Sequence, residues 1–183
     1  MDITRAAVEK QSRFDGLCGI FCLVNAVRNW GESSFSPDDR DSLRYMIEAA
    51  ERLNLFSSHR YMNGFEAHEM IDIFCEFSRA HRFPARAIHL STMANALEKW
   101  SFSVQSKRIF EQAGQILLPV DSGRHWVLAY GYDFENARIL VDDPDPDPNP
   151  ENVKTNIASQ GIWGGGRQGV LLLPNNCSLR FSE

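Results

Sequence analysis

The chain has 183 residues and a net charge of −5, and 43% of its residues are hydrophobic. This size and composition predict one globular domain with its own core. The basic residues are scattered, which argues against a nucleic-acid-binding surface. No apolar run approaches the roughly 20 residues that a membrane-spanning helix needs. The first ten residues lack the apolar core of a signal peptide, so we expect a cytoplasmic protein unless such a signal has been removed.

The first two thirds of the chain are predicted to be helical. Apolar residues on all sides of the segment 18–30 indicate a buried helix. The same 3.6-residue periodicity predicts a helix in residues 64–81, where Cys75 is expected to be a core residue. Ser91 is expected to cap a further short helix in residues 91–100. A helix is also expected in residues 36–54, with an apolar stripe made of Leu43, Ile47, Ala50 and Leu53.

Beyond residue 114 the pattern changes to short β-rich runs separated by turn-forming segments, which predict an antiparallel sheet. These runs are residues 115–121, 125–133, 137–143 and 169–174. The alternating prolines of residues 143–150 cannot continue a strand, because proline has no backbone N–H to donate. A helical part in about residues 1–114 and a sheet in about residues 115–183 predict a single α+β domain.

The chain has four cysteines, and in this context they do not suggest a disulfide framework. A zinc site would need closer cysteine pairs near histidines, so neither a metal nor a cofactor is expected. Cys18 stands at the expected start of a helix, where the dipole and free N–H groups favour a thiolate and the neighbouring glycines leave room for an oxyanion. Cys22, one turn further along, is interpreted as core packing. By itself, a cysteine at a helix start is more often structural than catalytic.

His125 leads one predicted strand directly after a glycine turn, and Asp142 and Asp143 end the next. If these two strands pair through the turn at residues 134–137, an aspartate returns beside His125. Its carboxylate can then fix the imidazole tautomer and stabilise the imidazolium that forms when the histidine takes a thiol proton. Adjacent strand residues face opposite sides, so only one of the two aspartates can do this. The other is interpreted as a solvated or turn-capping residue.

The segments "QSRFDGLCGIFCLVN" and "HWVLAYGYDFENARILVDDPDP" resemble papain-like cysteine peptidases, most closely the branch that processes bacteriocin leader peptides. Phytochelatin synthases and several bacterial effector proteases or deamidases look similar at this level. The resemblance does not cover residues 31–114. It implies a papain-like α+β fold, in which a helical N-terminal part with the nucleophile at the start of a buried helix packs on a C-terminal antiparallel sheet. Cys18 is then the nucleophile, His125 the base, and Asp143, the residue before Pro144, the orienting acid.

Gln11 is the oxyanion donor that the resemblance implies. The glutamine of the family is expected one residue nearer to the cysteine, where this chain has Ser12. A one-residue insertion in "SRFDG" would restore Gln11 to this role. The alternative stays open that Gln11 is a surface residue and that the Cys18 N–H acts with another donor.

Together these features predict a thiol hydrolase that cleaves an amide bond of a protein or peptide substrate through an acyl-enzyme. A protein glutamine deamidase, a transpeptidase and a peptidoglycan amidase, the last of which would need export without a signal peptide, are alternative outcomes of the same triad. A catalytically silent papain-like binding module and a metal-binding protein that uses Cys and His are further alternatives. The glycine-rich loop in residues 161–169 is expected to border the pocket. No membrane or nucleic-acid partner is expected, and the sequence gives no indication of the oligomeric state.

Overall fold

The computed structural model describes residues 16–30, 39–57, 63–90, 108–120, 125–133, 138–144 and 169–177. Their main helices and strands are α1 (Cys18–Asn29), α2 (Asp39–Arg52), α4 (Ala67–His81), β1 (Ala85–His89), β2 (Gln115–Val120), β3 (His125–Asp133), β4 (Arg138–Asp142) and β5 (Val170–Pro174). A single helical turn at residues 108–111 precedes β2.

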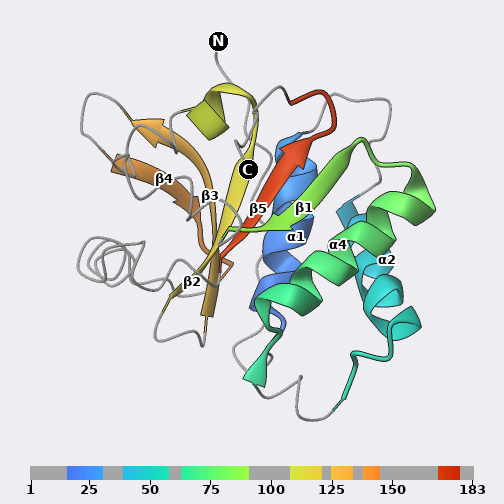
Figure 1. Cartoon of the computed structure of the whole chain (residues 1–183). Coiled ribbons are helices and arrows are strands. Elements are labelled where there is room, and N and C mark those ends of the chain that lie inside the picture. The colour runs from blue at the N-terminus through green and yellow to red at the C-terminus, as the bar shows by residue number, and fades with distance from the viewer. Residues whose placement is uncertain are drawn as a thin grey trace.

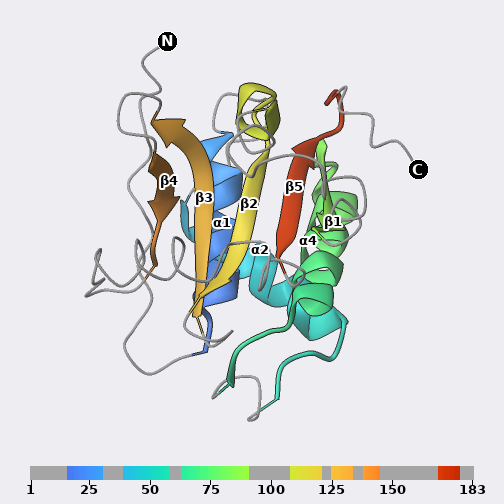
Figure 2. The same cartoon turned by 60° about the vertical axis from the view of Figure 1, so that its left-hand side comes forward.

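The strands form one five-stranded sheet in the order β1-β5-β2-β3-β4, and every neighbouring pair is antiparallel. The three helices lie together on one face of this sheet (Figures 1 and 2). Helix α1 packs against β3, and α4 packs against β1. The predicted α+β class with an antiparallel sheet is therefore confirmed.

Strand β1 was not predicted, because it lies within the part of the chain that was expected to be helical. It pairs with β5 along its whole length, from Ala85 opposite Pro174 to His89 opposite Val170. Its sequence, ARAIH, is short and buries mainly two alanines on the helix side, so it lacks the β-branched and aromatic residues that usually mark a strand. The sheet therefore includes a strand from the N-terminal half of the chain.

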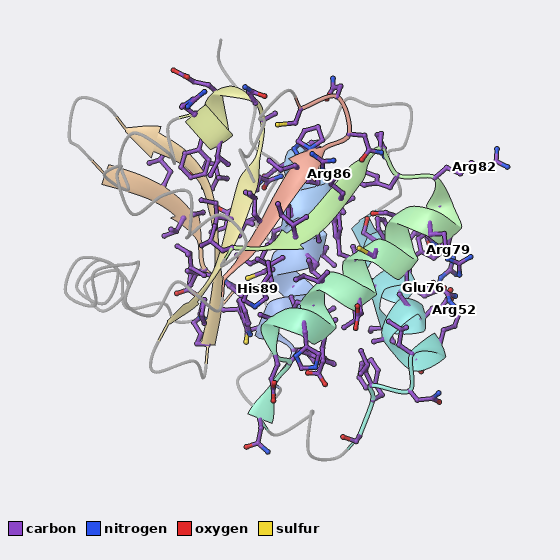
Figure 3. The ribbon with its side chains drawn as sticks, viewed as in Figure 1. Arg52, Glu76, Arg79, Arg82, Arg86 and His89 are labelled. Carbon is purple, nitrogen blue, oxygen red and sulfur yellow. The ribbon has the colours of Figure 1, made fainter. Side chains whose placement is uncertain are left out.

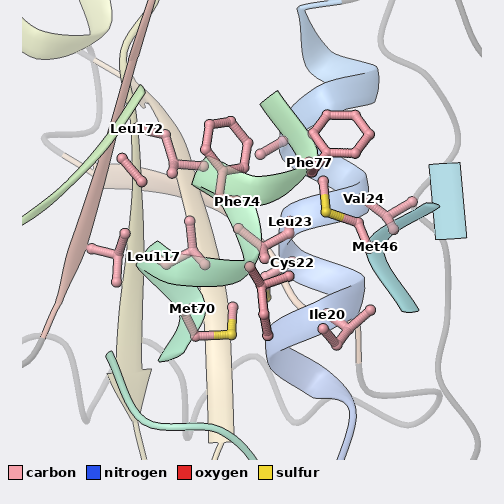
Figure 4. Close-up of a cluster of buried hydrophobic side chains, with 14 of the residues drawn as sticks. Ile20, Cys22, Leu23, Val24, Met46, Met70, Phe74, Phe77, Leu117 and Leu172 are labelled. Atoms are coloured by element: carbon pink, nitrogen blue, oxygen red, sulfur yellow. The ribbon is translucent and has the colours of Figure 1, made fainter. Parts of the chain in front are cut away.

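The main core lies between the helices and the sheet (Figure 4). As predicted, α1 is apolar on all sides, and each residue from Cys18 to Val27 is buried. Phe74 and Phe77 of α4 are fully buried beside Leu117 and Leu172 of the sheet. Alternate residues of the same strands, with Leu90 and Ile109, form a second cluster that includes Leu118, Val127, Ala129, Leu171 and Leu173. The strands are therefore buried on both faces at this point.

Two details of the helices differ from the prediction. Helix α2 turns Met46, Ala49 and Ala50 into the core, whereas Leu53, placed in the predicted stripe, is 36% exposed at the end of the helix. Cys75 is exposed, although it was expected in the core. The core side of α4 is taken by larger neighbours that follow the helical period, and Cys75 lies outside that stripe.

Helices α2 and α4 are also linked by charged side chains on their outer surface (Figure 3). The Glu76 carboxylate accepts a hydrogen bond from Arg52 Nε at 2.9 Å and one from Arg79 Nη2 at 2.7 Å. The hydrogen bond from Arg79 is the main cause that lowers the pKa of Glu76. Across the described part of the chain, the helices are too short or too polar to cross a membrane.

Candidate active site

Cys18 lies in the first turn of α1, and the residue is 3% exposed. Leu17 occupies the N-cap position, and its carbonyl accepts the first helical hydrogen bond from the Phe21 N–H at 3.0 Å. None of the described side chains caps this helix start, and the first turn contains no acidic residue. The helix dipole therefore acts on Cys18 without a neutralising carboxylate in that turn.

His125, the first residue of β3, forms a hydrogen bond with Asp143, the first residue after β4. The distance from His125 Nε2 to Asp143 Oδ1 is 2.7 Å, and the two side chains are 19% and 11% exposed. Strands β3 and β4 pair directly, so the end of β4 returns beside the start of β3 as the sequence pattern requires. Pro144 follows at once and ends the strand, because it has no N–H for the ladder.

The electrostatic environment of His125 connects it to Cys18 as well as to Asp143. Burial alone lowers the pKa of the imidazole, but hydrogen bonds to Asp143 and to Cys18 outweigh it and raise the pKa from 6.5 to about 10. Since Asp143 occupies Nε2, the ring nitrogen left for the thiol is Nδ1. Cysteine, histidine and aspartate are thus joined into one chain of interactions.

Asp142, the neighbour of Asp143, points to a different partner. Its side chain is buried, at 2% exposure, and its Oδ2 accepts a hydrogen bond from Asn29 Nδ2 at 3.2 Å. The structure thus brings Asp143 to His125 and Asp142 to the end of α1, as the alternation of strand side chains requires. Asp142 is neither the solvated nor the turn-capping residue that the sequence analysis expected.

Cys22 lies one turn inside α1 and is fully buried. Its thiol donates a hydrogen bond to the Trp126 carbonyl at 3.3 Å. Burial is the main cause that raises its pKa well above the ordinary value, and the nearby Cys18 and Asp143 add to this effect. A thiol of this kind stays protonated, so the interpretation of Cys22 as core packing is confirmed.

Trp126 anchors the start of β3, a role that the sequence analysis missed. Its indole Nε1 donates to the Phe65 carbonyl at 2.9 Å, which ties β3 to the segment that leads into α4. The same segment reaches Gly16, because a Cβ at Gly64 would lie 3.3 Å from the Gly16 carbonyl oxygen. Gly64 also has a φ of +77°, a conformation that favours glycine. The sequence signal that could have indicated this anchoring role was a tryptophan directly after the candidate base His125.

Gly19 has a different function from the one expected of it. A Cβ at this position would lie 2.6 Å from Met70 Sδ, so the space beside the helix is already occupied by a side chain of α4. The glycine therefore allows α1 and α4 to pack closely. The absence of a side chain at Gly19 therefore does not leave room for an oxyanion on this side of the helix.

Several predicted features lie outside the described residues. They are Gln11, the proposed oxyanion donor, the short helix in residues 91–100 that Ser91 was expected to cap, the proline-rich residues 145–150 and the glycine-rich loop up to residue 168. Within the described residues, no group of three or more His, Cys, Asp or Glu side chains is placed to hold a metal ion. The geometry that can be described is that of a thiol, an imidazole and a carboxylate at the junction of α1, β3 and β4.

Comparison with known proteins adds no relative to this picture. The chain matches no model of a protein family, and no curated protein matches it. The function of this protein is therefore inferred from the site itself and from the resemblance of its two motifs to papain-like peptidases.

Proposed function

We propose that this protein is a thiol hydrolase that cleaves an amide bond in a protein or peptide substrate. The observation that carries the proposal is the 2.7 Å hydrogen bond between His125 and Asp143, with Cys18 close enough to the same imidazole to raise its pKa. A nucleophile, a base and a group that orients the base form the minimal machinery of covalent acyl transfer. Here the three come from the start of a helix and the facing ends of two paired strands.

The reaction begins when His125 takes the proton of the Cys18 thiol, giving a thiolate and an imidazolium. The thiolate attacks the carbonyl carbon of the substrate amide, and the π electrons of the C=O bond move to the carbonyl oxygen. When the tetrahedral intermediate collapses, the C–N bond breaks and the imidazolium protonates the leaving amine. Water then attacks the thioester, with His125 as base, and releases a carboxylic acid and the free thiol. Throughout this cycle Asp143 holds Nε2 and stabilises the imidazolium.

The oxyanion of the intermediate needs hydrogen-bond donors, each of which contributes about 3 kcal/mol to such a step. The N–H of Cys18 lies in the first turn of α1, where backbone N–H groups have no partner within the helix. Gln11 remains the predicted second donor. We further propose that the fold is papain-like, which is supported by the antiparallel sheet and by the cysteine at the start of a buried helix.

The four cysteines are free thiols, as proteins of a reducing compartment usually keep them. This agrees with the expected cytoplasmic location, which stays a prediction.

The chain contains its own control for a test of Cys18. Cys75 is exposed, whereas Cys18 is 3% exposed and Cys22 is fully buried. At pH 6 an ordinary thiol, with a pKa of about 8.5, is almost entirely protonated and reacts slowly with iodoacetamide. If accessibility alone decided, Cys75 would be alkylated first. We expect Cys18 to be alkylated first, as read by mass spectrometry of peptides after short exposures.

The His125→Ala variant supplies the matched control for this measurement. It should slow alkylation of Cys18 and leave that of Cys75 unchanged, because only Cys18 depends on the imidazole. Preferential labelling of Cys75 in the wild-type protein would contradict the proposal and favour a catalytically silent binding module.

Activity itself can be tested by incubating cell lysate with the wild-type protein and, in parallel, with Cys18→Ala. New peptide termini that appear only with the wild type identify a peptidase. Conversion of glutamine side chains to glutamate, without new termini, would identify a deamidase that uses the same triad. If neither change depends on Cys18, amide hydrolysis of lysate proteins is not the function.

A further inference from the structure

Asp142 is a buried carboxylate next to the triad but not part of it. Its Oδ2 accepts a hydrogen bond from Asn29 Nδ2 at 3.2 Å, and the same nitrogen also donates to Gln115 Oε1 at 3.3 Å. Gln115 Nε2 in turn donates to the Ala26 carbonyl at 2.9 Å. This polar cluster of Asn29, Gln115 and Asp142 joins the end of α1 to β2 and to the last residue of β4.

The position of the cluster is electrostatically costly. A carboxylate beside the C-terminal end of a helix faces the negative end of the helix dipole, and burial removes the water that would otherwise solvate it. Asn29 offsets this cost because both hydrogens of its amide are directed at oxygen atoms. Gln115 also satisfies Ala26, one of the last four carbonyls of α1, which have no partner within the helix. An apolar residue at position 142 would avoid this cost altogether, so the presence of an aspartate there calls for another reason.

That reason is found in the register of β4. Asp142 lies opposite Leu128, and the pairing of β3 with β4 is shifted by an irregularity between Ala129 and Gly131. A bulge of this kind bends the strand and changes where its end points. Because strand side chains alternate, a shift by one residue would exchange the directions of Asp142 and Asp143. Something must therefore select which of two adjacent, chemically identical side chains reaches His125.

We propose that Asn29 is a positioning residue, which binds Asp142 and thereby fixes the end of β4 so that Asp143 meets His125. The inference rests on the proposed function, because it assigns a purpose to Asn29 only if the His125–Asp143 pair is part of a catalytic site. It makes the two aspartates a matched pair with different duties: Asp142 holds the register, and Asp143 orients the base.

The test uses an exchange of side chains. Asn29→Asp keeps the shape of the side chain but replaces its donor with an acceptor, so it repels Asp142. The double variant Asn29→Asp with Asp142→Asn restores one hydrogen bond with donor and acceptor reversed, at the same net charge as the wild type. Asn54→Asp makes the same chemical change at an exposed turn and serves as the control.

The first readout is the titration of the His125 ring followed by NMR. The titratable groups that act on this ring are Cys18 at the start of α1 and Asp143 directly after β4, and Cys22 lies close to both of them. The wild-type pKa should lie far above 6.5, Asn29→Asp should lower it, and the double variant should recover much of the loss. The second readout is alkylation of Cys18 at pH 6, which should slow about tenfold in Asn29→Asp, as expected when a hydrogen bond to a charged group is lost.

The outcomes separate this inference from the proposed function. An ordinary pKa for His125 in the wild type would overturn both. A raised pKa in the wild type that is unchanged in folded Asn29→Asp would overturn only the positioning role. If Asn29→Asp fails to fold, the double variant and Asn29→Ala provide the comparison. Recovery of the raised His125 pKa in the double variant supports the positioning role. A double variant that folds but has an ordinary His125 pKa overturns it.

Discussion

Helices α1 and α4 begin close together, yet their first turns are built differently. The segment before α4 contacts the segment before α1, where Gly64 approaches the Gly16 carbonyl. At α4 a capping box joins Glu66 and Glu69, and the Glu69 carboxylate accepts the Glu66 N–H at 2.8 Å. At α1 no described side chain caps the helix, and Cys18 stands at its first position.

The difference separates stability from reactivity. A capping box satisfies two backbone donors and stabilises the helix that carries it. A helix start without such a cap keeps its donors and the positive end of its dipole for an anion, such as a thiolate or an oxyanion. The candidate site lies at the helix start without a described cap, while at the other end of α1 a side chain satisfies the backbone, because Gln115 donates to the Ala26 carbonyl.

The largest effect is expected from a change of Asp143, because this residue of the sheet binds His125, the candidate base for Cys18 at the start of α1. Asp143→Asn removes the carboxylate that raises the pKa of His125, while burial, which lowers it, remains. The pKa of about 10 in the wild type should therefore fall by several units, as measured by NMR titration of the ring. Asp142→Asn, one residue away, is the matched control and should lower it less.

The same shift has a consequence for stability with a definite sign. Because the folded-state pKa of His125 is higher than the ordinary value of 6.5, protonation of this ring stabilises the folded protein. That contribution is complete below pH 6.5 and is lost as the pH rises through about 10. Denaturant unfolding across this range should show the loss in the wild type and a much smaller one in Asp143→Asn. Equal pH dependence in both proteins would contradict the assigned role of Asp143.

A second effect tests why α1 and α4 can lie so close. Gly19→Ala would place a methyl group 2.6 Å from Met70 Sδ and 2.9 Å from Met70 Cε, in a fully buried contact. Overpacking of this kind typically costs about 1–3 kcal/mol of unfolding free energy. Met70→Ala in the same chain makes room for the methyl group, so the two changes should be less than additive. Strict additivity in urea unfolding would show that the contact does not limit the packing.

The sequence predicts the parts of this site that have local signals. The apolar character of residues 18–30 predicted the buried helix, and alternation with turn residues predicted four of the five strands. Strand alternation also showed that Asp142 and Asp143 must have different partners, and the family resemblance favoured Asp143, the one the structure brings to His125. Each of these inferences uses neighbours in the chain or a short hairpin, where geometry follows from the period of the element.

What could not be predicted depends on contacts between distant segments. Asn29 and Gln115 have no motif, and Asn29 meets both Gln115 and Asp142 only because α1 ends where β2 begins and β4 ends. Strand β1 carries a weak pattern and is a strand because β5 pairs with it. The core face of α2 was predicted only in part: Ala50 is buried and Leu43 packs against the core, but Met46 rather than Leu53 completes that face. The neighbours of the helix, rather than its own period, make this choice.

The smallest effect is expected at the capped start of α4. Glu69→Ala removes the carboxylate that accepts the Glu66 N–H, and loss of a helix cap costs about 1 kcal/mol. Glu69→Gln is the matched control, because a glutamine can fill the same position of a capping box. Both variants should leave the alkylation rate of Cys18 unchanged, since the cap stabilises α4 without taking part in the reactive start of α1. If Glu69→Ala slowed Cys18 as strongly as it destabilised the fold, the two helix starts would be one coupled unit, and the division between a stabilising and a reactive turn would be wrong.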